Sequence, residues 1–429
     1  MYDFASGAGI VPERNRKEDS MPQTEQGANL ARVKAANQAA ILKTIYHHGP
    51  IKRAEIAQRL GLTLPTITTN VSAMIGRGIV REAGTVQPGE RIVGRKAHPV
   101  DIVPESRRFI GLEIQGTRRT LCLLDYRGRA LYTRADDEYC PDYGRNLELA
   151  RDMVFQALGA CGLRMEDIAG LGVCMPGLVD PQQGVLETRP SLSWSNKDVR
   201  KDMAALTGCA GPVSVENNAC ARAYGAQLFQ RAALGDAQTF AYLFINVGIA
   251  CPLVLNTASV FGSVVGAGEV GHMIMEQNGL RCSCGNRGCL EAYSSDWAVL
   301  RRCREVLAAG RAPLLREICG GAPPAMEHLL EAQEAGDPDA AEIAEKAIQV
   351  LGVAVANINN FACPDRMLIE GKLFFRQENR DRLLEVVRRN LCSVIRRGTE
   401  FIFVEPDVFS GAMGAAAVSI CKDLETYVE

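Results

Sequence analysis

The stretch GEVGHMIMEQNGLRCSCGNRGCLEAY, residues 268–293, brings cysteine and histidine side chains close together in the sequence. It holds Cys282, Cys284 and Cys289, and His272 lies ten positions before the first of these cysteines. One imidazole and three thiolates make a complete tetrahedral ligand set for Zn²⁺. Because four protein ligands leave no open position, we expect one structural zinc ion per chain. A chance cluster is the alternative, since the chain has 15 cysteines, but the others are scattered.

The same stretch resembles the signature of the ROK family, which is named for repressors, open reading frames and sugar kinases. The resemblance is carried by EVGH at 269–272 and by CSCGNRGCLE at 282–291, and it extends from about residue 29 to the C-terminus. It implies an α/β, actin-like, two-lobed sugar-kinase fold. In the repressors of this family, such as those of the xylose and N-acetylglucosamine types, a winged helix-turn-helix precedes that fold.

Three segments are therefore expected along the chain. Residues 1–27 are polar and rich in mixed charge, which favours a disordered leader. Residues 28–103 are predicted to form a winged helix-turn-helix DNA-binding domain. Residues 104–429 are predicted to form the kinase-like effector domain with its two lobes. A length of 429 residues is consistent with two or three domains.

Composition limits the class of protein. The chain is 47% hydrophobic and 23% charged, as expected of a globular protein. It has no apolar run of about 18 residues, so no membrane span is expected. The first 20 residues lack the layout of a secretory signal. Irregularly spaced cysteines indicate a reducing compartment, so we expect a cytoplasmic protein.

Charge is distributed unevenly along the chain. Residues 28–103 hold eleven Lys and Arg but only four Asp and Glu, which gives this segment a net charge of +7. Since the whole chain carries −2, the remainder carries −9. A basic module on an acidic body indicates a polyanionic partner, double-stranded DNA, for the module alone.

The basic segment has the order of a helix-turn-helix. Apolar spacing predicts a helix over 29–48, which ends at the Gly-Pro at 49–50, and a second helix over 51–61. Thr63 is the expected N-cap of a third helix, with Pro65 in its first turn. Small hydrogen-bonding side chains are expected on the exposed face of this helix, where they would read bases in the major groove. They are Thr66, Thr68, Thr69, Asn70 and Ser72.

A wing is predicted after the third helix. Two strands, at 79–82 and 97–103, flank the segment TVQPGERIVGRK at 85–96. Basic side chains near its tip are expected to contact phosphates and so to position the module. The full set of predicted DNA contacts is Arg53, Thr63, Thr66, Thr68, Thr69, Asn70, Arg91, Arg95 and Lys96. The alternative is a small helical packing domain with a solvated charged face.

From residue 108 the hydrophobic period changes to that of strands. Residues 109–132 alternate and turn as a β-hairpin or meander. Strands and helices then alternate to the end of the chain, which is typical of an α/β fold. Expected strands lie at 168–173, 213–215, 240–246, 367–370 and 401–404, with helices at 147–158, 379–391 and 410–424 and through most of 296–358.

The body departs from the catalytic pattern of ROK kinases. The resemblance implies an Asn-Asp base at the head of a helix, but residues 217–218 are Asn217 and Asn218, and an amide cannot accept the proton. The family's phosphate loop Asp-x-Gly-Gly-Thr is EIQGT at 113–117, and its Gly-Thr-Gly-x-Gly loop is GIACP at 248–252. Proline removes an N–H donor. The glycine pair near 370–372 is also broken. We therefore expect no ATP binding and no kinase activity.

The sugar side is better preserved. The resemblance implies that sugar hydroxyls are held by the residues that correspond to Asn217, Asn218, Glu269, His272 and Glu291. Zinc would fix the loop that bears His272 and Glu291. Ser191 replaces an asparagine of the family pattern, which changes one sugar contact. The alternative is that these polar residues are structural remnants that bind nothing.

Together these features predict a transcriptional regulator that represses carbohydrate genes. A winged helix would bind an operator, and a catalytically silent body would bind a sugar or sugar phosphate. Binding to a two-fold symmetric operator predicts a homodimer or homotetramer. Two alternatives stay open: a sugar kinase with an appended DNA-binding domain, and a regulator whose body senses a protein partner.

Overall fold

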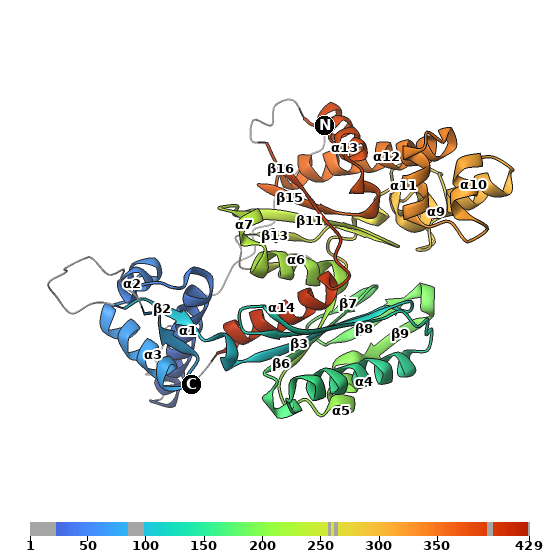
Figure 1. The fold of residues 1–429 in the computed structure, drawn as a ribbon. Helices are drawn as coiled ribbons and strands as arrows, with labels where there is room; N and C mark the ends of the chain where they lie inside the picture. The colour runs from blue at the N-terminus through green and yellow to red at the C-terminus, as the bar shows by residue number, and fades with distance from the viewer. Residues whose placement is uncertain (1–22, 85–97, 256–258, 261–264, 393–397, 428–429) are drawn as a thin grey trace, which may run out of the picture.

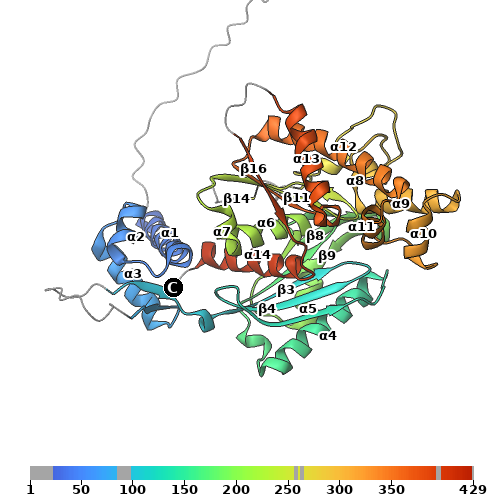
Figure 2. The ribbon, with the colours of Figure 1, turned by 45° about the horizontal axis from the view of Figure 1, so that its top comes forward.

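A computed structural model describes residues 23–84, 98–255, 259–260, 265–392 and 398–427. The N-terminal helices form a small module at one end of the molecule, and two larger lobes lie beyond it (Figure 1). Helices α6 and α14 run between the sheets of the two lobes (Figures 1 and 2). Within the described residues, every helix is too short or too polar to cross a lipid bilayer.

The N-terminal module has the predicted order of helix, helix, helix and two-stranded wing. Its elements are α1 (Gln23–His48), α2 (Arg53–Leu60), α3 (Leu64–Gly76), β1 (Val80–Glu82) and β2 (Val100–Ile102). The two strands pair antiparallel, with Arg81 opposite Asp101. The predicted winged helix-turn-helix is confirmed as an arrangement of elements.

Local sequence explains the turn between α2 and α3. Gly61 ends α2 at φ 64°, a left-handed conformation that glycine adopts without strain. Thr63 caps α3, because its side chain accepts a hydrogen bond from the N–H of Thr66. Pro65 lies in the first turn, where its missing N–H costs nothing. The roles of Thr63 and Pro65 follow the prediction.

The start of α1 corrects the expected leader. This helix begins at Gln23, so residues 23–27 of the segment predicted as disordered are helical. Residues 23–28 read QTEQGA, which has no apolar periodicity and therefore gave no signal of a helix. Residues 1–22, the rest of the predicted leader, lie outside the described residues.

The first lobe is built on a five-stranded sheet in the order β10-β6-β3-β4-β5. Strands β3 to β5 form the predicted antiparallel meander, and β6 and β10 lie parallel to β3. The strands are β3 (Arg108–Ile114), β4 (Arg119–Asp125), β5 (Ala130–Asp136), β6 (Gly170–Met175) and β10 (Val213–Asn217).

Other elements of the first lobe surround this sheet. Side chains of α4 (Tyr143–Cys161) and α5 (Val199–Thr207) pack in one core with the inner residues of the strands. A separate three-stranded antiparallel sheet follows β6 and was not predicted. It comprises β7 (Leu178–Asp180), β8 (Val185–Arg189) and β9 (Trp194–Asp198).

The second lobe is built on a mixed sheet with β11 and β15 parallel at its centre. Its strands are β11 (Thr239–Ile245), β12 (Ile249–Ala250), β13 (Leu253–Leu255), β14 (Ser259–Val260), β15 (Arg366–Glu370) and β16 (Glu400–Val404). Its helices are α7 (Arg231–Leu234), α8 (Glu291–Ser294), α9 (Asp296–Ala308), α10 (Pro313–Cys319), α11 (Met326–Glu334), α12 (Pro338–Ala362) and α13 (Gln377–Asn390). Short 3₁₀ turns occur at Pro104–Ser106, Met165–Asp167, Pro190–Leu192, Val270–His272 and Lys372–Phe375.

Helices α6 (Asn218–Phe229) and α14 (Ser410–Thr426) lie between the two sheets, and small residues let them approach closely. A Cβ atom on Gly172 of β6 would lie 1.8 Å from the Ala415 carbonyl oxygen of α14. A Cβ atom on Gly414 would lie 2.3 Å from the Ala221 carbonyl oxygen of α6. The small-residue helix predicted at the C-terminus is therefore a central packing element of the body.

The DNA-binding module is packed onto the first lobe. Ile41 and Ile45 of α1 share one buried core with Tyr126 of the β4–β5 turn and with Leu424 of α14. The Arg127 guanidinium lies over the ring of Tyr46 at 5.3 Å and pairs with the Asp101 carboxylate of β2. The module is thus in direct contact with the element that runs between the lobes.

Candidate metal and effector site

The four predicted metal ligands converge. The ligand atoms of His272, Cys282, Cys284 and Cys289 all lie within 4.8 Å of one another. The His272 Nδ1 to Cys282 Sγ distance is 3.7 Å, and the Cys284 Sγ to Cys289 Sγ distance is 3.8 Å. Metal–sulfur bonds of about 2.3 Å in a tetrahedron place ligand atoms about 3.8 Å apart. The cluster therefore has the size and donor set of one tetrahedral metal site.

Glycines shape the loop that carries the cysteines. Gly285 and Gly288 have φ of 96° and 79°, which side chains rarely tolerate. A Cβ atom on Gly288 would lie 1.7 Å from the Glu276 carbonyl oxygen, so that position has no room for a side chain. The loop is closed by a hydrogen bond from the Cys282 N–H to the Asn286 carbonyl at 2.9 Å.

Two predicted sugar-binding carboxylates lie beside this loop. Glu269 precedes the 3₁₀ turn that carries His272. Burial raises the pKa of Glu269, while His272 lowers it and Glu291 raises it further. Glu291 begins α8, and its Oε1 accepts a hydrogen bond from the Ser283 hydroxyl at 3.1 Å. The electrostatic influence of Glu269 also reaches the Cys220 thiol in α6. The two carboxylates therefore lie near the metal cluster, and Glu269 also lies near the start of α6.

Asn217 is largely committed to the backbone. It caps α6, with its Oδ1 accepting from the N–H groups of Ala219 at 2.8 Å and Cys220 at 3.3 Å. Its Nδ2 donates to the Gly177 carbonyl at 2.9 Å. A side-chain amide has two N–H donors, so, as far as the described residues show, one N–H of Asn217 is left for a ligand.

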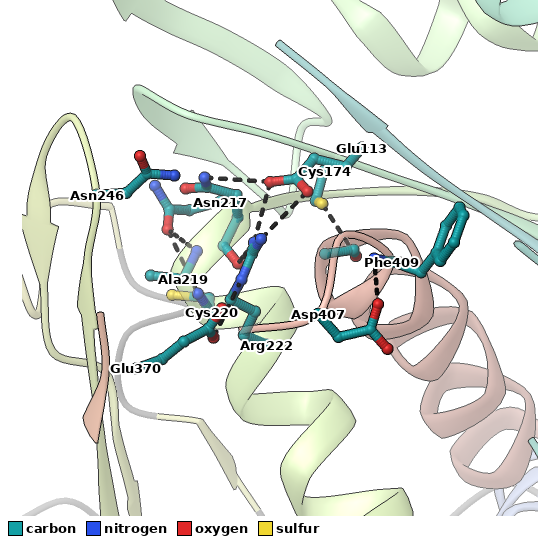
Figure 3. A network of polar contacts seen from close by, with 12 residues as sticks. Glu113, Cys174, Asn217, Ala219, Cys220, Arg222, Asn246, Glu370, Asp407 and Phe409 are labelled. Carbon is teal, nitrogen blue, oxygen red and sulfur yellow. Dashed lines mark hydrogen bonds and ion pairs between the residues drawn. The ribbon is translucent and has the colours of Figure 1, made fainter. Parts of the chain in front are cut away.

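Asn218 belongs to a buried ionic network that the sequence did not predict. Its Nδ2 lies 3.4 Å from Glu113 Oε1, and Arg222 donates to both Glu113 oxygens at 3.0 and 3.2 Å (Figure 3). Arg222 Nε lies 3.4 Å from Glu370 Oε2, which also accepts from the Tyr242 hydroxyl at 2.6 Å. The Arg222 side chain thus lies between carboxylates from β3 and β15.

The charged side chains of this network are buried. The side chains of Arg222, Glu113 and Glu370 are 5%, 2% and 3% exposed. Burial alone disfavours the charged guanidinium, yet Glu113 and Glu370 hold the pKa of Arg222 above its usual value. Burial also raises the pKa of Glu370, although Arg222 and Tyr242 oppose the shift. An arginine in the alanine-rich sequence NACARAYGAQLF was the available signal for this network.

The segments that match the family's phosphate loops are packed as ordinary backbone. In the second, Ile249 and Ala250 form β12, and Ile249 and Cys251 are buried in the core of the second lobe. The Cys251 N–H donates to the Gly268 carbonyl at 2.7 Å, and the Pro252 carbonyl accepts from Tyr242. In the first, the Gln115 N–H donates to the Arg118 carbonyl at 2.9 Å. One backbone N–H in each of these two segments is thus hydrogen-bonded within the chain.

The DNA-binding face follows the prediction at some positions and departs from it at Asn70. Thr68 and Thr69 are exposed on α3, although the Thr68 hydroxyl donates to the Leu64 carbonyl of its own helix. Asn70 is only 8% exposed and donates to the Thr66 carbonyl at 2.8 Å. Asn70 was predicted to lie on the exposed face, and that placement is wrong because the residue lies at the edge of the buried stripe of α3.

The basic residues predicted to contact DNA are only partly described. Arg53 forms an ion pair with Glu82 at 2.8 Å, which links α2 to the first strand of the wing. Arg91, Arg95 and Lys96 lie outside the described residues. Thr63 and Thr66 share a hydrogen bond between their hydroxyl oxygens at 2.8 Å.

Comparisons with known proteins agree with this architecture. The chain is 28% identical over 371 residues to a putative xylose repressor of Caldicellulosiruptor sp. (strain Rt8B.4), covering 84% of this chain and 88% of the relative. It is 27% identical over 363 residues to the DNA-binding transcriptional dual regulator NagC of Escherichia coli (strain K12), covering 81% and 83%.

Solved structures share the fold. A ROK family transcriptional regulator, described as a homolog of the E. coli MLC protein, superposes with a TM-score of 0.73 at 24% identity, covering 92% of this chain and 97% of that one. A ROK family glucokinase from Streptomyces griseus gives 0.60 at 23% identity, covering 72% and 98%. Residues 35–82 match the MarR family, and residues 109–421 match the ROK family, so the chain belongs to the ROK family.

Proposed function

We propose that this chain is a DNA-binding transcriptional regulator, a repressor of carbohydrate genes, whose winged helix binds an operator and whose body binds a sugar or sugar phosphate. One observation carries the proposal most directly. A MarR-type module is packed onto α14, which runs between the two lobes of a sugar-kinase fold. The names of the relatives, xylose repressor and NagC, support the same function.

The proposed effector site comprises the side chains of Asn218, Glu269, His272 and Glu291, together with the remaining N–H of the Asn217 amide. Carboxylates and amides suit vicinal hydroxyls, because each hydroxyl offers both a donor and an acceptor. His272 is shared in this proposal between the metal cluster, toward which its Nδ1 lies, and the effector. Since Asn217 and Asn218 also bind the chain itself, Glu269 and Glu291 are expected to supply most of the binding energy.

The body is proposed to have no kinase activity and to bind no ATP. The position of the family's catalytic base is Asn218, whose amide faces Glu113. Glu113 itself is held by Arg222 and is not available to a metal–nucleotide complex. The second phosphate-loop segment is the short strand β12. These features together support a body that binds ligand without turnover.

Zinc is proposed as the metal, one ion per chain, in a structural role. The three thiolates and one imidazole suit Zn²⁺, and four protein ligands close the site. When bound, the ion would hold together the loop that carries His272, Ser283 and Glu291. The site's chemistry in this proposal is therefore to position Glu291 and His272 and not to activate water.

The proposed partner is a two-fold symmetric operator, which requires a homodimer or homotetramer in the cytoplasm. One recognition helix contacts only a few base pairs, and a second copy supplies the other half-site. Effector binding between the lobes would change the spacing of the two winged helices through α14. Movement of lobes around a ligand is a known way to displace a distant domain.

Operator affinity measured with and without a panel of sugars and sugar phosphates tests this function. A true effector should change affinity about 5- to 150-fold in the wild type. Glu269→Ala should abolish that response and keep operator binding without effector. Glu317→Ala, which removes an exposed carboxylate from α10 in the same lobe, should respond as the wild type does.

Other outcomes would overturn parts of the proposal. Phosphorylation of a sugar by ATP would make the chain a kinase with an appended DNA-binding domain. An equal response in wild type and Glu269→Ala would place the effector elsewhere than at this site. Absence of any response across the panel, with operator binding intact, would favour a protein partner as the signal.

A further inference from the structure

A cavity lies where the DNA-binding module meets the body. Its volume is about 450 Å³, and three separate segments form its walls. Tyr46 and His47 come from the end of α1, residues 127–129 from the β4–β5 turn, and Leu228, Phe229, Arg231 and Ala232 from α6 and α7. The cavity therefore joins α1, which carries the winged helix, to α6, which carries Asn218 and Arg222 at its other end.

All charged side chains that line this cavity are basic. Arg127 is neutralised, since its guanidinium pairs with Asp101 and also donates to the Tyr46 carbonyl. Asp125 turns its Oδ1 to the N–H groups of residues 127 and 129, at 2.9 Å each. Among the described residues, Arg231 donates to a neutral group alone, the His47 carbonyl, at 2.9 Å.

Arg129 is exposed, and within the described part of the chain its guanidinium has neither an ion pair nor a hydrogen bond. Arg129 and Arg231 are thus two cations on one cavity without carboxylate partners. An exposed pair of this kind can receive an acidic group at little cost, since no existing ion pair has to break first.

Two polar atoms at the same place also lack partners. The Tyr46 hydroxyl is buried without a hydrogen bond, and the Tyr46 residue is 5% exposed. The Nδ1 of His47 is buried and unpartnered as well. Buried polar groups are nearly always hydrogen-bonded, so two orphaned atoms show that polar packing at this junction is incomplete among the described residues. Burial and the nearby charges of Arg231 and Lys43 lower the pKa of His47 to about 3, as expected where positive charge is uncompensated.

The opposite wall is apolar. Leu228 and Phe229 line it, and Gly128, at φ 81°, lies against the Phe229 ring. A Cβ atom at Gly128 would come within 2.2 Å of that ring. The cavity therefore combines apolar side chains with two guanidinium groups that have no carboxylate partner among the described residues, which suits an organic molecule that bears an acidic group.

We propose that this junction cavity binds a small organic anion, a phosphorylated or carboxylated metabolite, through Arg129 and Arg231. The ligand would contact α1 and α6 at once, so it would fix the DNA-binding module against the body. This site is separate from the proposed sugar site beside the metal cluster and does not depend on it.

Calorimetric titration of the full-length, metal-loaded protein with sodium pyrophosphate and with sodium citrate tests this site at constant ionic strength set with NaCl. The two probes distinguish phosphate from carboxylate recognition. Wild type should bind at least one of them saturably. Arg129→Gln should weaken that binding at least tenfold, because a charge-assisted contact is lost. Glu269→Ala, at the proposed sugar site, should bind the probe as tightly as the wild type.

Arg134→Gln is the matched control, because it removes one exposed positive charge from β5 of the same sheet. It should leave the affinity for the probe unchanged. Equal weakening by Arg134→Gln and Arg129→Gln would reduce the effect to general charge and overturn the proposal. So would a lack of saturable binding of both probes. If Arg129→Gln instead weakened operator binding without probe, the basic groups would serve DNA phosphates and the anion site would be refuted.

Discussion

At the scale of single residues, burial changes the chemistry of Asp296. It lies at the first turn of α9, and its N–H donates to the Asn246 carbonyl at 2.8 Å. Burial raises the pKa of Asp296 to about 7, opposed by Lys372 and reinforced by Glu327. The folded state therefore favours the protonated acid. The resulting stabilisation is complete below about pH 4, the pKa in the unfolded chain, and is lost as pH rises through about 7.

Asp296→Asn should remove this pH dependence. At pH 8 the variant should be more stable than the wild type by roughly 2–4 kcal/mol, since each pKa unit corresponds to about 1.4 kcal/mol. At pH 5 the difference should be smaller. Urea unfolding at both pH values measures it, with Asp236→Asn, an exposed acid, as control. The same difference at pH 5 and pH 8 would contradict a titrating Asp296.

A second residue-scale prediction concerns the metal cluster. Freshly purified protein should contain about one zinc per chain, because the ligand set is closed. Cys284→Ser should lose most of the metal and lower Tm, since the free energy of metal binding contributes to folding. Cys392→Ser removes another exposed thiol, far from the cluster in sequence, and should leave both the zinc content and Tm unchanged. Elemental analysis and thermal unfolding give the result, and a wild type without zinc would refute the assignment.

These residues also show what the sequence could predict about the site. The metal ligands lie within 18 positions, 272–289, so their convergence could be predicted from their spacing in the sequence. The network of Glu113, Arg222 and Glu370 joins positions that are far apart in the chain, and only the folded body brings them together. Asn70 was predicted to be exposed but is buried, because it lies at the border between the apolar and polar faces of α3. Helical periodicity does not determine whether such a border residue is buried; tertiary packing does.

At the scale of elements, strands and helices with strong periodicity were predicted, as the meander β3–β5 and the terminal helix α14 show. The sheet β7–β9 was missed. Its strands are three to five residues long and carry mixed side chains such as WSNKD, so they give no clear alternation. Such strands form because the neighbouring core needs a cover, with Trp194 and Leu186 buried against the first lobe.

The close contact of α14 with the first sheet gives an element-scale prediction. Gly172→Ala should destabilise the protein by about 1–3 kcal/mol or more, because the new methyl group meets the Ala415 carbonyl. Gly159→Ala is the matched control in α4, where an added methyl has nothing within 4 Å and should be neutral or slightly stabilising. Chemical unfolding of both variants measures the difference. Equal stability of both variants would mean that α14 can move away from the sheet at no cost.

At the scale of the whole molecule, Arg222 connects the two lobes. Glu113 belongs to the first sheet, Glu370 to the second, and Arg222 to α6 between them (Figure 3). The ring of Phe244 in β11 lies 4.2 Å from the guanidinium carbon. A buried cation held by two carboxylates tolerates little change in geometry, because an unpaired buried charge is costly. The network therefore favours one relative position of the lobes.

Arg222→Met should show how far the lobes depend on this connection. Loss of the cation leaves two buried carboxylates facing each other, so unfolding free energy should fall by about 3–5 kcal/mol. Adding Glu113→Gln to Arg222→Met should recover part of that loss, since one unpaired charge is removed. Urea unfolding of the three proteins measures both steps.

The same two variants separate stability from signalling. If lobe position carries the signal from effector to operator, the double variant should bind operator but show a smaller change of affinity with the best-binding sugar. If the double variant regains stability and its operator affinity still responds fully to the sugar, the Arg222 network does not carry the signal. The signal would then pass through α14 and its contact with α1. Reduced coupling together with unchanged sugar affinity in the absence of operator would locate the lost step between the lobes, where Arg222 lies.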